Sequence, residues 1–277
     1  MVDWSALNIA ASVVLYHHTA EAVAPTVRSI LASSLITRLT IVDNGGGSWA
    51  RGQADGRVTY LDAGRNLGYG AGHNLAIRTS AATVDYYAVV NPDVAFEAGT
   101  LERLAAFAER RKAGLVMPDV RYPDGRRQYL CKLLPTPLNL FARRFLPSAI
   151  VQRLDERYEL HAADYRQPFF VPCLSGCFML FDARVLLAVG GFDERFHLYL
   201  EDTDLSRRVA ERAPTLYCPE AQVVHAFNKL SYRDPGLLKV HVQSALRYFN
   251  KWGWCVDGGR RRLNQRCLAE LPYAVKR

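Results

Sequence analysis

The amino-acid sequence predicts an α/β protein in which a mostly parallel central sheet is flanked by helices. Strand-like and helix-like segments alternate up to residue 120, and the first strand segment, NIAASVVLY at residues 8–16, is apolar on both faces. Apolar strands separated by helix-length segments indicate parallel pairing with helices covering the sheet. The 277 residues suffice for one substantial core.

The elements of the first half follow in a regular order. Strands are expected at residues 8–16, 38–44, 57–64, 85–94 and 113–120, with helices at 21–33, 70–80 and 99–112. Ligands of open parallel sheets bind beyond the carboxyl ends of the strands. Asp43 and the run Asn91–Pro92–Asp93 stand at such ends. These residues are therefore better site candidates than carboxylates elsewhere.

The second half is less regular. Residues 135–161 mix apolar residues with four arginines, which indicates a helical excursion with a solvated face or a basic amphipathic segment on a membrane. Further elements are expected as a strand at 176–181, a helix at 182–191, strands at 215–219 and 221–227, and a helix at 235–252 opened by Pro235. The basic GGRRRLNQR at 258–266 is expected to be mobile. We expect a main domain over residues 1–234 and a carboxyl-terminal helix with a basic tail over 235–277.

Composition excludes several classes of protein. With 49% hydrophobic and 22% charged residues, the chain is typical of a globular protein. No apolar segment approaches the roughly 18 residues of a membrane helix, and no signal peptide is recognisable. The six cysteines form no C-x-x-C pair, so we expect reduced, structural thiols and a cytoplasmic location. The net charge of +8 suits anionic membranes or phosphorylated substrates, whereas no nucleic-acid recognition motif stands out.

The stretch HLYLEDTDLSRRV at residues 197–209 crowds three carboxylates behind an apolar run. Such carboxylates cost free energy unless they are paired. One interpretation is a helix over residues 204–212 with Asp202 or Thr203 as its N-cap, where acidic side chains suit the helix dipole. The other interpretation is catalysis, and these residues alone favour neither.

Three further motifs carry chemistry. The glycine-rich NLGYGAGHN from Asn66 can cradle a diphosphate or form only a tight turn, and its spacing is not that of a dinucleotide fingerprint. Asp93 can hold Mg²⁺ or Mn²⁺ together with substrate phosphates, or simply open a turn. His225 ends a strand and either completes a metal site or is only hydrogen-bonded.

In their order along the chain, these motifs resemble the family 2 glycosyltransferases over roughly residues 8–251. The shared pattern is VDN, NLGYGAGHN, NPDV, LSGCFML, GGFDERFHLYLEDTDLSRR and VVH, and its long run over residues 190–208 is the most specific part. Within the family the pattern is most similar to bacterial rhamnosyltransferases of cell-surface polysaccharide synthesis. The resemblance implies a GT-A fold, in which a nucleotide-binding half is fused to an acceptor-binding half, and metal-dependent inverting sugar transfer.

The resemblance also implies roles for individual residues. Asp202 would be the catalytic base, and Asp93 and His225 would bind the Mg²⁺ or Mn²⁺ ion that bridges the donor diphosphate. The donor would be bound by Asp43, Asn44, Asn66, Gly68, Asn74, Asn91, Asp93, Lys229, Ser231 and Arg233. On the acceptor side would lie Ser175 and Gly176, with Glu201 and Asp204 orienting the acceptor or bracing the loop.

The implied donor is dTDP-L-rhamnose, with UDP- and GDP-sugars also open, and the implied acceptor is a glycan or a lipid-diphosphate-linked glycan. Peripheral contact with the inner face of the cytoplasmic membrane is compatible with the basic segments. The sequence departs from the pattern at His17 and His18, where a small polar residue is usual, and in the three glycines after VDN. Two alternatives are a nucleotidyltransferase that makes the sugar nucleotide and a non-catalytic glycan- or membrane-binding protein of the same fold.

Overall fold

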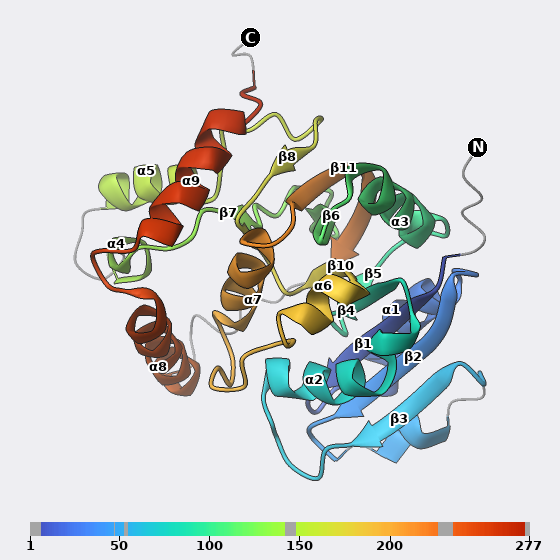
Figure 1. Cartoon of the computed structure of the whole chain (residues 1–277). Helices are drawn as coiled ribbons and strands as arrows, with labels where there is room; N and C mark the ends of the chain where they lie inside the picture. Colours follow the sequence, from blue (N-terminus) through green and yellow to red (C-terminus); the bar gives the residue numbers. More distant parts are fainter. Residues whose placement is uncertain (1–6, 47, 53–54, 142–147, 227–234, 275–277) are drawn as a thin grey trace.

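A computed structural model describes residues 7–46, 48–52, 55–141, 148–226 and 235–274 (Figure 1). Within these residues one large sheet carries the core. Its strands are β1 (Ile9–Leu15), β2 (Ile36–Asp43), β3 (Val58–Asp62), β4 (Tyr86–Val90), β5 (Val94–Ala95), β6 (Leu115–Arg121), β8 (Phe169–Phe170), β10 (Phe178–Asp182) and β11 (Thr215–His225). Two further strands, β7 (Cys131–Lys132) and β9 (Cys173–Leu174), form a small second sheet.

The large sheet has the order β3-β2-β1-β4-β10-β6-β11-β5, and β8 pairs with β11. Strands β1 to β4 are parallel to one another, as are β6 and β11, whereas β10 runs antiparallel between β4 and β6. The predicted α/β class with a mostly parallel sheet is therefore confirmed. The antiparallel strand joins two parallel groups into one sheet.

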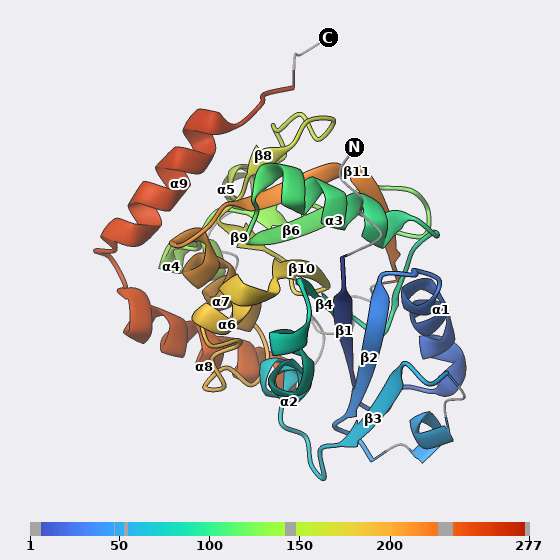
Figure 2. The same cartoon turned by 45° about the vertical axis from the view of Figure 1, so that its right-hand side comes forward.

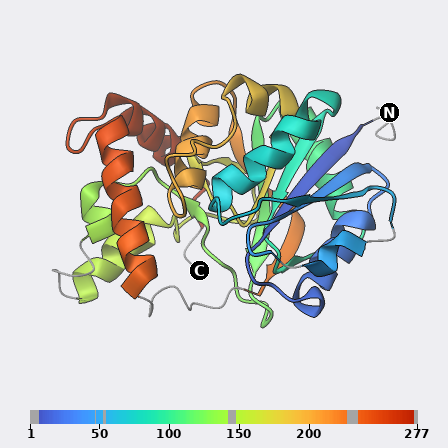
Figure 3. The ribbon, with the colours of Figure 1, turned by 90° about the horizontal axis from the view of Figure 1, so that it is seen from below.

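Helices cover both faces of this sheet. Helix α1 (Ala20–Leu31) and helix α2 (Tyr69–Ser80) lie on opposite faces, as Figures 2 and 3 show. Helix α3 (Thr100–Arg111), α6 (Ala183–Ala188) and α7 (Glu201–Ala210) complete the covering. Side chains of Thr19 and Asp182 accept hydrogen bonds at the starts of α1 and α6, which fixes where those helices begin.

Four helices gather on the side of the molecule away from β1–β3 in all three views (Figures 1–3). These helices, called the helical layer here, are α4 (Pro137–Phe141), α5 (Ser148–Tyr158), α8 (Pro235–Trp252) and α9 (Gly258–Glu270). The interpretation of residues 135–161 as a helical excursion agrees with α4 and α5. No helix among the described residues is long and apolar enough to cross a bilayer.

The expectation of a mobile basic tail was wrong. Residues 258–266 belong to α9, whose first turn is capped by the Asp257 side chain and which buries Leu263 and Cys267. These two side chains lie four residues apart, so they share one helix face that packs on the core. The segment begins with two glycines, and because glycine disfavours helices, the sequence pattern did not predict this helix.

One strand boundary also differs from the prediction. The two strands expected at 215–219 and 221–227 form one strand, β11, whose register shifts between Cys218 and Gln222. The proposed division at residue 234 falls in a segment outside the described residues. Across it, the guanidinium of Arg207 in α7 pairs with both carboxylate oxygens of Asp257, at 2.6 and 2.7 Å, and fastens α9 to the main body.

Candidate active site

Strand pairing brings Asp93 and His225 together. Strand β5 pairs antiparallel with β11 so that Val94 faces His225, and the Asp93 carbonyl accepts a hydrogen bond from the Ala226 amide at 3.0 Å. The Thr26 hydroxyl donates to the Pro92 carbonyl at 2.7 Å and holds the turn in place. As a result, Nε2 of His225 lies 3.3 Å from Oδ1 of Asp93.

Gln128 orients the His225 ring, and nothing in its local sequence marks it. Its amide nitrogen donates to the His225 carbonyl at 2.8 Å, so its oxygen must face Nδ1 of the ring, 2.9 Å away. An oxygen in that position needs a proton on Nδ1, which leaves Nε2 pointing at Asp93. Residues that fix a histidine tautomer in this way commonly stand behind metal ligands.

The two side chains perturb each other strongly. Burial lowers the pKa of His225, but the hydrogen bond to Asp93 and the nearby Cys177 outweigh burial, so the pKa of His225 is raised. For Asp93, burial raises the pKa, and the hydrogen bond with His225 and its charge bring the pKa below its usual value. The space between Nε2 and the carboxylate therefore favours positive charge, either a second ring proton or a cation.

The donor set fits a divalent cation that is shared with a substrate. The Asp93 side chain is 35% exposed, so a ligand can reach it, and an imidazole nitrogen with a carboxylate oxygen suits Mn²⁺. Among the described residues no group of three or more His, Cys, Asp or Glu side chains gathers as a metal site. Two protein ligands with phosphate oxygens are a usual arrangement for Mg²⁺ in phosphate-binding sites.

The glycine-rich turn is built against the segment that precedes α7. Asn66 Oδ1 accepts from the Gly68 amide at 2.9 Å, and Asn44 Nδ2 donates to the Gly68 carbonyl at 2.9 Å. The next amide, of Tyr69, donates to the His197 carbonyl at 2.9 Å. Gly68 has φ +87°, and a Cβ there would lie 2.2 Å from the His197 carbonyl oxygen, so only glycine fits.

Asp43 shapes the loop after β2. Its buried carboxylate accepts from the Gly45 and Gly46 amides at 2.8 and 3.0 Å and from the Tyr60 hydroxyl at 3.0 Å. A Cβ at Gly45 would approach the His17 amide nitrogen to 2.7 Å. The two departures from the family pattern are thus connected: the backbone at Gly45, the first glycine after VDN, lies directly against His17.

Asp202 lies at the start of α7, half-buried, with both carboxylate oxygens held by backbone amides. Oδ2 accepts from the Gly176 amide at 2.9 Å and Oδ1 accepts from the Thr203 amide at 2.7 Å. The expected N-cap at Asp202 or Thr203 was wrong, because the helix begins earlier, at Glu201. Its N-cap, Leu200, follows Tyr199, and both have positive φ, +66° and +68°. Consecutive non-glycine residues in this region store strain and are typical of functional sites.

Glu201 is a buried partner of Asp202. It is 6% exposed, and its Oε2 has no hydrogen-bond partner among the described residues. Burial raises the pKa of Glu201 well above its usual value, and the neighbouring Asp202 charge raises it further. The protonated form of Glu201 is therefore favoured.

Two expected site residues instead brace the segment over residues 192–204. Asp204 is fully buried and pairs with Arg208 Nε at 2.8 Å, Lys251 Nζ at 2.6 Å and Trp252 Nε1 at 2.8 Å. Asn74 exchanges hydrogen bonds of 2.9 Å with the Phe192 backbone. For Asp204 the geometry favours bracing over direct contact with an acceptor.

A single turn connects the Asp93 and Asp202 sides of the site. The Asn91 amide donates to the Cys177 carbonyl at 2.9 Å, one residue from the Gly176 amide that holds Asp202. The Ser175 hydroxyl lies in the same turn and accepts from the Cys177 amide at 3.4 Å.

The Tyr69 hydroxyl donates a hydrogen bond to the Gly176 carbonyl in this turn, at 2.5 Å. Sequence reasoning missed Tyr69. Burial raises the pKa of Tyr69 well above its usual value, and four nearby groups raise it further: Glu201, Cys177, Asp202 and Asp93.

The structure thus gathers Asp93, His225, Asn91, Gly176, Glu201 and Asp202 around Tyr69, with Asn44, Asn66 and Gly68 in the adjoining turn. Lys229, Ser231 and Arg233, expected on the donor side, lie outside the described residues. A carboxylate, a histidine–carboxylate pair and a glycine-rich turn thus lie together beside the strand ends, where open α/β sheets bind their ligands.

Comparison with known proteins identifies the class. A family model described as "Glycosyltransferase like family 2" matches residues 8–247, and the chain belongs to this family. It is therefore a glycosyltransferase rather than the nucleotidyltransferase or the non-catalytic protein that the sequence alone left open. The chain is 31% identical over 225 residues to the N-acetylglucosaminyl-diphospho-decaprenol L-rhamnosyltransferase of Mycobacterium tuberculosis, covering 74% of this chain and 71% of that protein.

Solved structures confirm the GT-A fold. GalNAc-T7 with UDP, GalNAc and Mn²⁺ has a TM-score of 0.59 at 12% identity, over 80% of this chain and 44% of that chain. The mannosyltransferase PcManGT of Pyrobaculum calidifontis with GDP-Man and Mn²⁺ has a TM-score of 0.59 at 15% identity, over 87% and 64%. TarS 1–349 of S. aureus has a TM-score of 0.58 at 13% identity, over 95% and 71%. This chain thus spans less than half of the GalNAc-T7 chain.

Proposed function

We propose that this protein transfers L-rhamnose, with inversion, from dTDP-L-rhamnose to a sugar hydroxyl of a lipid-diphosphate-linked glycan. The observation that carries the proposal is the placement of the Asp202 carboxylate across the Gly176–Cys177 turn from the Asp93–His225 pair. The rhamnosyltransferase relative, named for its diphospho-decaprenol acceptor, supports the choice of donor sugar and acceptor class.

Asp202 acts as the base in this proposal. Its oxygens are held by the Gly176 and Thr203 amides, so the carboxylate is oriented before an acceptor arrives, and it takes the proton of the attacking hydroxyl. Glu201, favoured in its protonated form, does not compete as a nucleophile. A site with one ionised carboxylate next to the acceptor suits direct displacement, which inverts the anomeric centre.

The donor side uses the other residues. Asn66 and Asn44 hold the Gly68 turn, whose backbone lines the start of α2. Asp93 and His225 hold Mg²⁺ or Mn²⁺, which when bound neutralises the charge of the departing diphosphate. Gln128 keeps one ring proton of His225 on Nδ1, so that Nε2 is the nitrogen at which the ion would replace a second proton.

The surface of the helical layer supports a location at the inner face of the membrane. Residues 235–277 contain nine Lys and Arg but two Asp and Glu, so they carry most of the net charge of +8. Ten large apolar side chains are exposed among the described residues, and eight of them, including Ile150, Val242 and Trp254, belong to the helical layer or to the residues that flank α9. Cationic and apolar side chains on one side suit an anionic bilayer surface.

The first test is thermal unfolding with dTDP, UDP, GDP and CDP, each with and without Mn²⁺. A nucleotide at 100 times its dissociation constant should add about 2.7 kcal/mol to the free energy of unfolding. We expect dTDP to stabilise the protein only with Mn²⁺. Stabilisation by another nucleotide instead of dTDP would mean that the donor carries that nucleotide. Equal stabilisation with and without Mn²⁺ would mean that the metal has no part in donor binding.

A further inference from the structure

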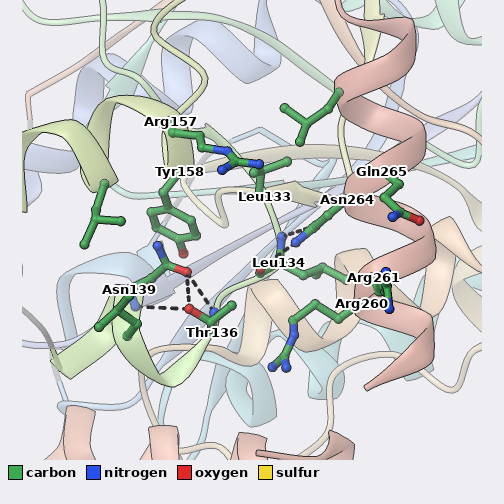
Figure 4. A pocket seen from close by; sticks show the side chains of 13 residues that line it. Leu133, Leu134, Thr136, Asn139, Arg157, Tyr158, Arg260, Arg261, Asn264 and Gln265 are labelled. Atoms are coloured by element: carbon green, nitrogen blue, oxygen red, sulfur yellow. Dashed lines mark hydrogen bonds between the residues drawn. The ribbon is translucent and has the colours of Figure 1, made fainter. Parts of the chain in front are cut away.

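An apolar groove of about 370 Å³ lies in the helical layer, outside the site described above (Figure 4). It opens between α4–α5 on one side and α9 on the other, with the segment after β7 as its floor. Its volume falls in the range of roughly 300–1,000 Å³ that is usual for small-molecule sites. The residues that line it include Leu133, Leu134, Tyr158, Arg157, Arg261 and Gln265.

Most polar groups of the groove already have protein partners. Thr136 and Asn139 hydrogen-bond to each other, and Asn264 bonds to the Leu134 amide and carbonyl at 2.8 and 3.0 Å (Figure 4). The Arg260 guanidinium donates to backbone carbonyls, including that of Pro135 at 3.3 Å. A ligand in the groove therefore meets mainly leucine side chains and the Tyr158 ring, which favours an apolar ligand.

Two arginines give the groove a positive rim. Arg157, in the last turn of α5, and Arg261, in the first turn of α9, are exposed, and neither has an acidic partner among the described residues. Unpaired guanidinium groups on two facing elements suit an anion with several oxygens. An apolar floor with such a rim selects an amphiphile that has an anionic head.

The groove is connected to the active site through the small sheet. Lys132 in β7 pairs with Cys173 in β9, and three residues later Gly176 holds the Asp202 carboxylate. Leu133 follows Lys132 directly, so the groove floor lies within about 20 Å of Gly176 by chain length and strand spacing. A sugar, a diphosphate and the first units of a lipid chain can span this separation.

We propose that the groove binds the first isoprene units of a polyprenyl-diphosphate acceptor, with Arg157 and Arg261 facing its diphosphate. This inference rests on the proposed function for the identity of the acceptor, but the binding site itself can be tested alone. The leucines provide the apolar surface for the branched chain, and the two arginines distinguish a charged lipid from a neutral one.

The direct test measures binding of farnesyl diphosphate to the full chain by calorimetry in EDTA, which silences metal-dependent binding at the donor site. We expect Arg157→Gln/Arg261→Gln to weaken binding at least tenfold. The matched control is Arg153→Gln/Arg262→Gln, which changes exposed arginines of the same two helices outside the groove, with an expected change below twofold. Gln265→Trp should also weaken binding at least tenfold, because it narrows the groove without changing charge.

A second readout is kinetic. The ratio of kcat/KM for a long polyprenyl acceptor to that for a short-alkyl acceptor should fall at least tenfold in the groove variants and stay within twofold in the control pair. An equal loss of kcat/KM with both acceptors would overturn the proposal, because the groove would then not contribute to recognition of the polyprenyl chain.

Three other results would also overturn it. One is the absence of farnesyl diphosphate binding while dTDP with Mn²⁺ still stabilises the protein, a result that leaves the proposed function standing. Another is equal affinity for inorganic diphosphate, because the apolar floor would then contribute nothing. The third is a groove variant that still binds farnesyl diphosphate but no longer binds anionic phospholipid vesicles. This result would mean that the groove contacts the bilayer surface rather than the acceptor.

Discussion

The Nε2 atom of His225 lies 3.3 Å from Oδ1 of Asp93, although nearly half the length of the chain separates the two residues. The pairing of β5 with β11 sets this distance, and Gln128 sets the direction of the ring. A neutral imidazole in this orientation points its lone pair at a carboxylate, which is unfavourable until a proton or a cation lies between them. In the proposed function, the affinity of Asp93 and His225 for a metal ion would therefore depend on Gln128, which does not contact the ion.

Gln128→Leu should weaken the apparent affinity for Mn²⁺ by about 10- to 100-fold, because the ring loses the acceptor that keeps its proton on Nδ1. The measurement is a Mn²⁺ titration of dTDP-induced stabilisation. Gln222→Leu, an exposed position on the same strand as His225, is the control. An unchanged Mn²⁺ midpoint in Gln128→Leu would remove Gln128 from this role.

Asp202→Asn should bind the donor nucleotide but lose roughly 10²–10⁴ in transfer rate, the range for loss of a general base. The amide cannot take a proton, and its single oxygen can still accept from one of the Gly176 and Thr203 amides. Single-turnover transfer measures the rate, and Glu211→Gln at the other end of α7 is the control. Near-wild-type transfer by Asp202→Asn would assign the base elsewhere.

Asp204→Asn should lower the free energy of unfolding by about 3 kcal/mol, because Arg208 and Lys251 lose the charge that pairs them in a buried cluster. Chemical denaturation gives this value. Glu220→Gln, which breaks an exposed pair with Arg110, should cost under about 1 kcal/mol. Full stability with a raised acceptor KM in Asp204→Asn would instead support direct acceptor binding.

Gly68→Ala should destabilise the protein beyond the roughly 1–2 kcal/mol of a left-handed alanine, because φ +87° with ψ 179° is a backbone region that essentially only glycine adopts, and because its Cβ would collide with the His197 carbonyl. Gly64→Ala is the control: Gly64 also has positive φ, +68°, but nothing lies within 4 Å of its Cβ position. Denaturation midpoints of the two variants give the cost at Gly68 beyond that of a positive φ alone. Equal losses would show that the turn can move away from His197.

His73 should make the protein sensitive to mild acid. Burial lowers the pKa of His73 to about 3 from its ordinary 6.5, so between these values the unfolded chain binds the proton and the folded chain does not. Stability is then present above pH 6.5 and is lost as pH falls, by about 2 kcal/mol at pH 5. His73→Gln should remove this part of the difference between pH 7 and pH 5 in urea denaturation. An identical pH dependence in the variant would contradict the assignment.

Local patterns were enough to predict β1–β4 and α1–α3 to within a few residues, because each strand is an apolar run and each helix is bounded by nearby residues. For Asp93, Asp202 and His225 local patterns left a structural alternative open, and the resemblance to the family 2 glycosyltransferases selected them as site residues; the structure brings these together. The expected roles of these residues in catalysis and metal binding remain predictions.

The rest depends on pairings between distant segments. Gln128 lies 97 positions from His225, and no local signal connects the two. Tyr69 gains its position from a hydrogen bond to Gly176, 107 positions away. The direction of β10 and the helix α9 likewise depend on the neighbours they meet, which periodicity cannot reveal.

The antiparallel strand β10 also has a consequence for biosynthesis. Val90 at the end of β4 pairs with Phe178, so β4 has an open edge until the ribosome has released β10. Exposed strand edges invite aggregation, and pairings this far apart form slowly. The nucleotide-binding half therefore cannot complete its folding until Phe178–Asp182 has left the ribosome. Protein expressed as an amino-terminal fragment would need a chaperone to stay in solution, whereas the whole chain closes its own edge.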